Sequence, residues 1–432
     1  MTAHHCETTA VVTGIGVISP AGSQLDEFAK TVWSATPTAD AVTRCNTEGL
    51  STRIACEVRE FDPTSYMSPK TARRLDPYAQ FGLAAALTAV DDAGGSAAWA
   101  DVPQQRRAIV CGTGVGGYNV ACEQALVCDR NGPDRVSPLL IPMLMPNAAN
   151  AAIAMELGWR GPSLALATAC ASGSSAVGQA ARLIRDGRCT VALAGGADNG
   201  VTRISLAAFA QLGALSQRNQ EPQFASRPFD RNRDGYVMGE GSAFLVLESL
   251  DHARNRGARA YAQVCGYAEN NDAHHLTAPR PDGQPAAACM RSALDDAGLT
   301  ADQIGHINAH GTSTAANDAM EARALATVFG SWEKIPPITA PKGVFGHLMG
   351  GAGAIEAAVA ALSVHEGSVP PVANHSQGDV ELDGELDVVV GVPRRVGHRP
   401  VLSSSFGLGG QNASLVLGPV PNSRECVNQK SP

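Results

Sequence analysis

Short β-branched or apolar runs alternate with longer alanine-rich amphipathic stretches along this chain, which is the pattern of an α/β protein. The clearest runs with strand character are Thr9–Thr13, Ala108–Cys111, Leu164–Thr168, Thr190–Ala194, Ala243–Leu247, Tyr261–Gly266, His306–Ala309, Val401–Ser405 and Ala413–Leu417. Apolar residues at helical spacing predict helices over Pro69–Asp92, Ser172–Asp186, Pro285–Ala297, Ala319–Phe329 and Ala352–His365.

Two segments of equal length indicate an internal repeat. Gly173–Gly187 and Gly353–Gly367 each follow a candidate reactive residue, but they match at only four positions, so a duplication stays a hypothesis. The charged stretch Ser226–Asp234 and the arginine-rich loop around His252–Arg259 lie near the middle of the chain. We therefore predict a first half over residues 1–255, a second half over 256–420 and a tail over 421–432.

Composition excludes several classes of protein. The 432 residues carry 33 Lys and Arg against 41 Asp and Glu, a net charge of −8, so nucleic-acid binding is not expected. The sequence has no apolar run of about 18 residues, the length that a membrane-spanning helix needs. Residues 1–30 lack the pattern of a secretory signal, so we expect a cytoplasmic protein with no membrane partner.

The 11 cysteines are scattered, and none forms a Cys-x-x-Cys pair. This spacing argues against a zinc site and against a disulfide scaffold, so we expect no bound metal. Most of these cysteines are expected to be reduced and buried.

One cysteine stands in a distinctive context. In Gly161–Gly173 an apolar run leads directly into Cys170, and small residues then open a helix. The thiol is thus predicted at a strand-to-helix turn, beside unpaired backbone N–H groups and the positive helix end, which favours a thiolate. A helix end supplies about 0.3–2 kcal/mol, whereas a hundredfold shift toward thiolate needs about 2.7 kcal/mol, so a neighbouring base or cation must contribute. We interpret Cys170 as a nucleophile; the alternative is a buried structural cysteine.

Two histidines have surroundings suited to assist this cysteine. His310 lies in Asn308–Thr314 at the end of an apolar strand, and His347 lies in Pro341–Gly353, just before a helix that contains Glu356. A histidine at a strand end is more often structural than catalytic, so the residues alone leave both interpretations open.

The segment Gly112–Gly117 formally fits the G-x-G-x-x-G pattern of dinucleotide-binding proteins. Such a site also needs an acidic residue at the end of the next strand, about 20 positions on. Asp134 has the distance but lies in a loop, so we favour a close-packed turn over an NAD(P)-binding oxidoreductase.

Two other patterns are weaker still. Asp230–Gly235 begins like a calcium loop, but its twelfth position is Gly241 in place of glutamate. Ser172 and Ser174 suggest a serine hydrolase, but no G-x-S-x-G surrounds them.

Six motifs together resemble the β-ketoacyl-acyl-carrier-protein synthases, or ketosynthases, of fatty-acid and type II polyketide pathways. The motifs are Val11–Pro20, Thr168–Gly173, Arg227–Val237, His310–Thr314 with Lys342–His347, and Ser405–Gly410, and they span almost the whole chain. The resemblance implies a thiolase-like fold, in which two similar halves form a five-layer αβαβα sandwich. It also implies a dimer, either of identical chains or with a chain-length-factor partner that lacks the nucleophile.

The resemblance assigns a role to each matching position. Cys170 accepts an acyl group from a carrier protein, while His310 and His347 hold a malonyl carbonyl and stabilise the enolate formed as CO₂ leaves. No cofactor is expected, because both substrates arrive on the carrier's phosphopantetheine arm. The further roles are Lys342 as a buried lysine next to His347, Glu356 as its paired acid, the backbone N–H groups of Cys170 and Phe406 as the oxyanion hole, Thr312 and Thr314 along the phosphopantetheine tunnel, Phe406 and Leu408 at the gate, and Val115 near the acyl pocket.

The carrier is acidic, so docking needs a local positive patch on this acidic chain. Ser68–Arg74 is predicted to be a capped helix start that presents Lys70, Arg73 and Arg74 on one face. By themselves, these cations are typical of an ordinary solvated helix face. The resemblance implies that they form the carrier-docking patch, to which Arg130 and Arg135 contribute.

The chain departs from the family pattern at three places, which favours a specialised pathway. Ala315 stands where a proline usually follows, which loosens a loop; Leu408 replaces a second phenylalanine, which reshapes the gate; and Pro341–Phe345 replaces a Thr-Lys-Ser start.

Three competing functions remain open at this stage. The same fold and Cys170 thioester can serve another acyl reaction, such as intramolecular cyclisation or transfer without an extender. The chain can also be a non-catalytic partner subunit, although the presence of Cys170 argues for the catalytic member. An NAD(P) enzyme is the most distant alternative.

Overall fold

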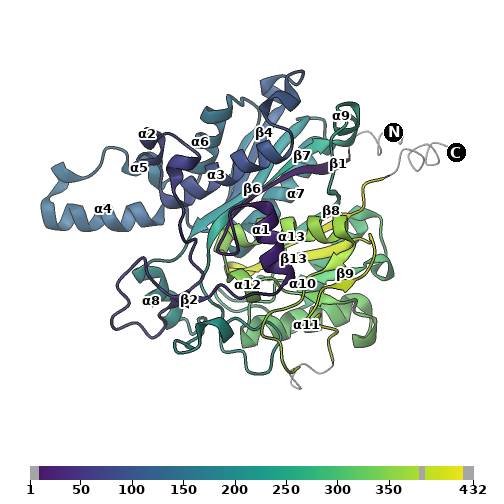
Figure 1. Cartoon of the computed structure of the whole chain (residues 1–432). Coiled ribbons are helices and arrows are strands. Elements are labelled where there is room, and N and C mark those ends of the chain that lie inside the picture. Colours follow the sequence, from purple (N-terminus) through teal and green to yellow (C-terminus); the bar gives the residue numbers. More distant parts are fainter. Residues whose placement is uncertain (1–8, 379–384, 422–432) are drawn as a thin grey trace.

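We describe the protein from a computed structural model, in which residues 9–378 and 385–421 are placed (Figure 1). Ten strands form one hydrogen-bonded sheet in the order β10-β9-β13-β14-β8-β1-β7-β6-β4-β5. The strands of its first half are β1 (Ala10–Ile18), β4 (Arg107–Gly112), β5 (Ser163–Leu166), β6 (Val191–Asn199) and β7 (Glu240–Ser249). Those of its second half are β8 (Ala262–Asn271), β9 (His306–Asn308), β10 (Ile338–Thr339), β13 (Val401–Gly407) and β14 (Gln411–Gly418).

The two halves of the sheet have the same topology. The order β1-β7-β6-β4-β5 in the first half is repeated as β8-β14-β13-β9-β10 in the second. The first two neighbour pairs are antiparallel and the last two are parallel in both halves. The halves join only where Ala10–Val12 of β1 pairs with Ala262–Val264 of β8. This repeat of connections is much clearer than the sequence match between the two helical segments.

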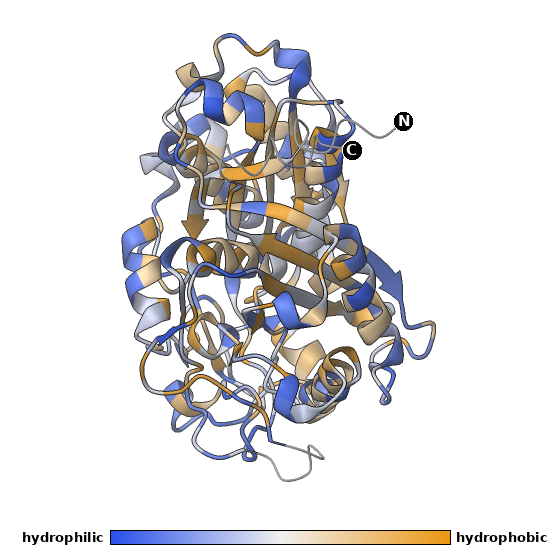
Figure 2. Cartoon of the chain, turned by 90° about the vertical axis from the view of Figure 1, so that its right-hand side faces the viewer, coloured by the Kyte–Doolittle hydropathy of each residue, from blue (hydrophilic) through white to orange (hydrophobic). Residues whose placement is uncertain are grey.

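Helices form three layers around these half-sheets (Figure 1). The helices α3 (Pro77–Asp92) and α6 (Ala148–Leu157) pack on the outer face of the first half-sheet. The helices α10 (Gln284–Ala297) and α11 (Ala315–Phe329) lie with the second half-sheet in a separate apolar core. Between the half-sheets lie α7 (Ser172–Arg185) and α13 (Ala352–Glu366), whose apolar residues fill the largest core. The expected five-layer αβαβα sandwich is therefore confirmed, with apolar strands in its interior (Figure 2).

The two central helices approach each other closely because small residues face the contact. A Cβ atom added to Gly173 would lie 2.4 Å from the backbone nitrogen of Ala354, and one added to Gly353 would lie 2.5 Å from that of Ser174. Each glycine is near the N-terminal end of its helix. This contact brings the segment that carries Cys170 beside the segment that carries His347.

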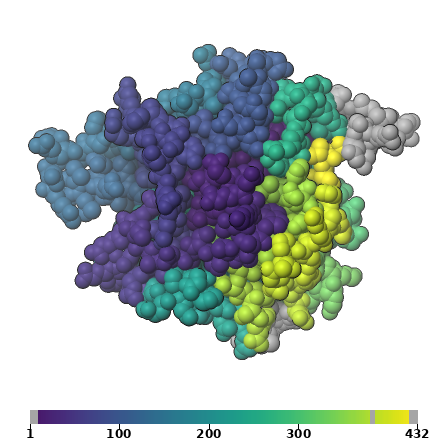
Figure 3. Space-filling model, in the orientation of Figure 1, coloured from purple at the N-terminus to yellow at the C-terminus, as the bar shows by residue number. Residues whose placement is uncertain are grey.

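The remaining elements surround this sandwich. They are α1 (Leu25–Trp33), α2 (Pro69–Ala72), α4 (Tyr118–Asn131), α5 (Leu140–Leu144), α8 (Arg203–Gln211), α9 (Leu250–Asn255), α12 (Lys342–Phe345), and the paired short strands β2 (Asp40–Ala41) with β3 (Ile54–Ala55) and β11 (Ser368–Val369) with β12 (Arg394–Arg395). The helix α4 projects from the body at the left of Figures 1 and 3.

One expected helix is divided into two. Pro69–Asp92 is not a single helix, because α2 ends at Ala72 and α3 begins at Pro77. Proline cannot continue a helix but suits its first position, and the Asp76 side chain caps α3 by accepting from the backbone N–H of Tyr78.

The predicted boundary between residues 255 and 256 falls where α9 ends, before β8, and we keep it as a proposal. Of the predicted tail over 421–432, only residue 421 lies inside the described part of the chain. Within that part, every helix is too short or too polar to cross a membrane, and nine cysteines are free thiols.

Candidate active site

Cys170 lies at the predicted strand-to-helix turn. The strand β5 ends at Leu166, a short 3₁₀ turn spans Ala169–Ala171, and α7 begins at Ser172. The Ser172 hydroxyl closes the turn, since it accepts from the backbone N–H of Thr168 at 2.9 Å and donates to the carbonyl of Ala169 at 2.6 Å. The Cys170 side chain is 7% exposed. The turn therefore presents the thiol to a cavity and leaves little of it open to solvent.

The two histidines converge on the same cavity. His310 follows β9 and His347 follows α12, and their ring centroids are 5.4 Å apart at an angle of 87°. Both rings and Cys170 line a cavity of about 400 Å³. Residues far apart in the sequence thus meet around one space large enough for a small substrate group.

Hydrogen bonds fix the tautomer of both imidazoles. The Nδ1 atom of His347 accepts from the backbone N–H of Met349 at 3.2 Å, and the Nδ1 atom of His310 faces the Nζ atom of Lys342 at 3.1 Å. Each ring therefore carries its hydrogen on Nε2. Burial, together with the charge of Lys342, lowers the pKa of both rings well below the usual value. At neutral pH both are uncharged N–H donors.

Lys342 and Glu356 form a buried ion pair behind His310. The Nζ atom of Lys342 also donates to the backbone carbonyl of His310 at 2.6 Å and to the carboxylate of Glu356. Both side chains are 1% exposed. Burial raises the pKa of Glu356, and the ammonium of Lys342 opposes that rise. The expected pairing is present, but in this structure the lysine contacts His310 and not His347.

The helix end favours a thiolate at Cys170, but burial outweighs this effect in the structure. Burial raises the pKa of Cys170 to about 11, and this outweighs the lowering by the Lys342 charge and by the backbone N–H of Leu408. Desolvating a thiolate costs more free energy than a helix end together with a single cation can offset. The buried thiol therefore keeps its proton at neutral pH.

Two buried carboxylates that the sequence did not single out support the site. Glu321 of α11 accepts from the backbone N–H groups of His310 and Gly311, each at 2.8 Å. Asp198 at the end of β6 accepts from the backbone N–H groups of Gly114 at 2.7 Å and Gly350 at 2.6 Å. Both hold loops of the site, Asp198 by contacts with residues distant in the sequence and Glu321 by contacts with residues 10 and 11 positions away.

The cavity includes most of the expected substrate positions. Thr312, Thr314, Phe406 and Leu408 line it, and the Phe406 ring lies 5.7 Å from His310. A Cβ atom on Gly407 would lie 3.0 Å from the Cys170 backbone nitrogen, so the chain beside Phe406 approaches the proposed oxyanion hole closely. Val115 is 42% exposed and does not line this cavity.

Ala315 does not loosen its loop in this structure. It is the first residue of α11, and the Thr314 hydroxyl caps this helix by accepting from the backbone N–H of Asn317. The reshaped gate expected from Leu408 stays a prediction.

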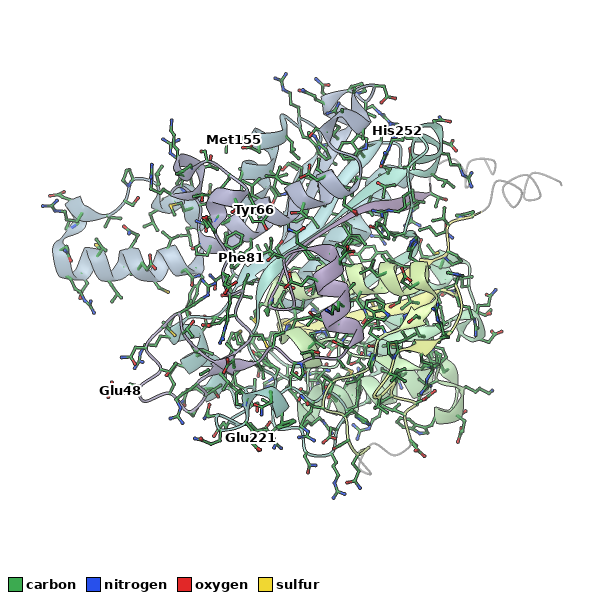
Figure 4. All side chains as sticks on the ribbon, in the orientation of Figure 1. Glu48, Tyr66, Phe81, Met155, Glu221 and His252 are labelled. Carbon is green, nitrogen blue, oxygen red and sulfur yellow. The ribbon has the colours of Figure 1, made fainter. Side chains whose placement is uncertain are left out.

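The predicted helix start and its cap are present, but α2 ends at Ala72, so Arg73 and Arg74 follow the helix and a shared helix face stays a prediction. The Ser68 hydroxyl caps α2 by accepting from the backbone N–H of Thr71 at 3.1 Å. Lys70, Arg73 and Arg74, hereafter the docking patch, are exposed and form no ion pair with any described residue. Just before this helix, Tyr66 stacks on Phe61, which packs edge-on against Phe81 of α3; Figure 4 labels Tyr66 and Phe81. Arg130 and Arg135 are exposed at the end of α4 and just after it.

The competing motifs have structural explanations. A Cβ atom on Gly112 would lie 2.3 Å from the Ser172 carbonyl oxygen and one on Gly117 would lie 2.1 Å from the Met143 carbonyl oxygen, so the glycine-rich segment is a close-packed turn. The buried carboxylate of Asp230 accepts from Arg227 and from three backbone N–H groups. Ser174 contacts Ser405 at 2.9 Å.

Comparison with known proteins decides the family. The model of the β-ketoacyl synthase N-terminal domain matches residues 8–253, and that of the β-ketoacyl synthase C-terminal domain matches residues 261–376. The chain belongs to the β-ketoacyl synthase family. It is therefore an acyltransferase of the condensing type.

Curated relatives and solved structures agree with this family. The 3-oxoacyl-[acyl-carrier-protein] synthase 2 of Synechocystis sp. is 40% identical over 407 residues, which cover 94% of this chain and 97% of the relative. The ishigamide ketosynthase/chain length factor structure has a TM-score of 0.87 at 36% identity and covers 96% of this chain and 99% of its own. A type II polyketide ketosynthase in complex with its acyl-carrier protein has a TM-score of 0.86 at 31% identity, covering 95% and 99%.

Proposed function

We propose that this β-ketoacyl synthase accepts an acyl chain on Cys170 and extends it by decarboxylative condensation with a malonyl group carried on an acyl carrier protein. The observation that carries the proposal is the convergence of one thiol and two imidazole N–H donors on a single cavity. Thioester exchange needs the thiol, and decarboxylation to an enolate needs the two donors.

In the first step, Cys170 takes the acyl group from the carrier. Its sulfur attacks the thioester carbonyl, the bond from that carbon to the pantetheine sulfur breaks, and the thiol proton ends on the departing pantetheine sulfur. Backbone N–H groups of Cys170 and Phe406 stabilise the negative oxygen of the tetrahedral intermediate.

In the second step, the malonyl carbonyl lies against the Nε2–H groups of His310 and His347. Loss of CO₂ moves an electron pair onto the carbonyl oxygen, and two fixed donors stabilise this charge without reorganising. The enolate carbon then attacks the Cys170 thioester. The sulfur leaves as a thiolate and takes a proton from solvent, and the carrier holds a β-ketoacyl chain two carbons longer.

The acyl groups arrive on a carrier protein's phosphopantetheine arm, so the reaction as proposed draws on no cofactor of its own. Thr312 and Thr314 line the cavity, as the tunnel for that arm requires. The docking patch supplies exposed positive charge for an acidic carrier. Val115 does not line the cavity described above. We keep the proposal that it lies near the acyl pocket, which then extends beyond this cavity.

We further propose that the chain works as the catalytic member of a dimer, with an identical copy or with a chain-length-factor-like subunit. Support comes from the presence of Cys170 and from the related ketosynthase/chain length factor structures. A specialised, polyketide-like pathway and a cytoplasmic location stay predictions.

The deciding experiment supplies acyl-carrier and isotopically labelled malonyl-carrier proteins and measures three quantities by mass spectrometry. We expect an acyl adduct on Cys170, release of labelled CO₂ and an elongated β-ketoacyl product. A Cys170→Ala variant is the control and should give neither adduct nor product. An adduct without CO₂ and without elongation would instead support another acyl reaction, such as cyclisation or transfer. Full product formation by Cys170→Ala would assign the chemistry to a partner subunit.

A further inference from the structure

A tyrosine hydroxyl at the active-site cavity has no partner in the described part of the protein. Tyr236 lines the cavity with Cys170 and both histidines, and its side chain is 7% exposed. No described residue accepts from or donates to this hydroxyl, and the hydroxyl is not fully sealed from solvent. A phenol that is this deeply buried normally has a hydrogen-bond partner. The missing partner is therefore expected to be something that enters the cavity.

The protein holds this side chain in a fixed position. The backbone N–H of Tyr236 donates to the carbonyl of Ala214, and its carbonyl accepts from the N–H of Ser216, both at 3.0 Å. Its ring packs edge-on against His347, with centroids 5.1 Å apart, and against Phe209 at 6.1 Å. The hydroxyl is thus carried on a rigid ring beside one of the two imidazoles.

The charges around the cavity indicate what the hydroxyl binds. Its described lining contains no lysine or arginine, and its one carboxylate is Asp272. Other hydroxyl and amide donors have protein contacts: Thr312 with Thr314, Asn317 with Asp318, and Asn412 with Asp272. Burial raises the pKa of Tyr236 well above its usual value, so the phenol keeps its hydrogen. Tyr236 is consequently a free neutral donor next to the imidazole pair.

The substrate of the proposed reaction brings an anion into this cavity. The malonyl group has a thioester carbonyl, which occupies the two imidazole N–H groups, and a carboxylate two bonds away. That carboxylate loses its water on entry and finds no cation among the lining residues.

We propose that the Tyr236 hydroxyl donates a hydrogen bond to the carboxylate of the malonyl extender and so selects a carboxylated extender group. This inference rests on the proposed function. The carboxylate loses its charge as CO₂ forms, so the hydrogen bond strengthens substrate binding more than it stabilises the transition state.

The test compares wild type with Tyr236→Phe, which keeps the ring and removes only the hydroxyl. For Tyr236→Phe we expect the KM for malonyl-carrier protein to rise about tenfold or more, because a hydrogen bond to a charged group is lost. We expect kcat to stay the same or rise, and Cys170 acylation to stay within about twofold.

A binding series isolates the contact from turnover. Two non-hydrolysable malonyl analogues on the carrier serve as inhibitors, one with a free carboxylate and one with that carboxylate capped as an amide. In Tyr236→Phe the inhibition constant of the carboxylate analogue should rise about tenfold or more, while that of the amide analogue, whose carbonyl accepts only a weaker neutral hydrogen bond, should rise by clearly less.

Tyr261→Phe is the matched control. It removes a phenol that donates to Asp92 at 2.9 Å and lies outside the cavity lining, so it should lower the melting temperature without changing either inhibition constant. Equal changes for both analogues, no change for either, or a parallel fall in Cys170 acylation would overturn the inference. Failure of the wild type to release CO₂ would instead count against the proposed function, and the analogue series would still report on the phenol.

Discussion

Lys342→Met tests how the buried ion pair serves the reaction. Methionine keeps a similar apolar stem but cannot donate to the Nδ1 atom or the carbonyl of His310, or to Glu356. The Glu356 carboxylate then remains buried, 1% exposed, without its cation. Breaking a buried pair in this way costs about 3–5 kcal/mol of unfolding free energy.

A second variant separates stability from chemistry. In Lys342→Met with Glu356→Gln the uncompensated charge is gone, so more than half of the lost unfolding free energy should return. The condensation rate should be about 10²–10³-fold below that of wild type in both variants, because the hydrogen of His310 is no longer held on Nε2. Denaturant unfolding and steady-state CO₂ release measure the two effects. A double variant that condenses at the wild-type rate would refute the tautomer argument.

The same variant should show a pH signature. Burial raises the folded-state pKa of Glu356 above its unfolded value, and removal of the cation raises it further. The folded variant then keeps this proton at pH values where folded wild type has released it, so the stability deficit grows as pH rises above the wild-type folded pKa of about 7. We expect the difference in unfolding free energy between Lys342→Met and wild type to shrink on going from pH 8 toward pH 5. A deficit that does not vary with pH would contradict this assignment.

Three further outcomes follow from the structure. Gly353→Ala places a Cβ atom 2.5 Å from the backbone nitrogen of Ser174 and should lower the unfolding free energy by about 1–3 kcal/mol, whereas Gly213→Ala, whose Cβ atom meets no described atom within 4 Å, should have a smaller effect. Alkylation of Cys170, followed by mass spectrometry, should speed up about tenfold per pH unit from pH 7 to 9 because its pKa is about 11; a flat profile would contradict a protonated thiol. Glutamate at all three positions of the docking patch should raise the KM for carrier-bound acyl groups about tenfold but leave acyl-pantetheine substrates unchanged, and the exposed Arg188→Glu serves as the charge control.

The order of apolar and polar residues determined much of this protein. It was sufficient to predict the α/β class, the main strands and the position of Cys170 at a strand-to-helix turn, because these depend on neighbours in the chain. The break between α2 and α3 was also readable, since Pro77 and the capping Asp76 are local signals. The repeat of the two half-sheets was not, because similar folds need few identical residues.

Only the tertiary structure decided the chemistry of the site. Cys170, His310 and His347 lie on separate elements, and their meeting depends on the close contact of α7 with α13. The protonation states follow from burial, which raises the pKa of the thiol and lowers the pKa of both imidazoles. The Tyr236 hydroxyl likewise has no described protein partner because of how the chain packs around the cavity. Desolvation and contacts between distant residues arise only when the chain packs, so no short stretch of sequence predicts them.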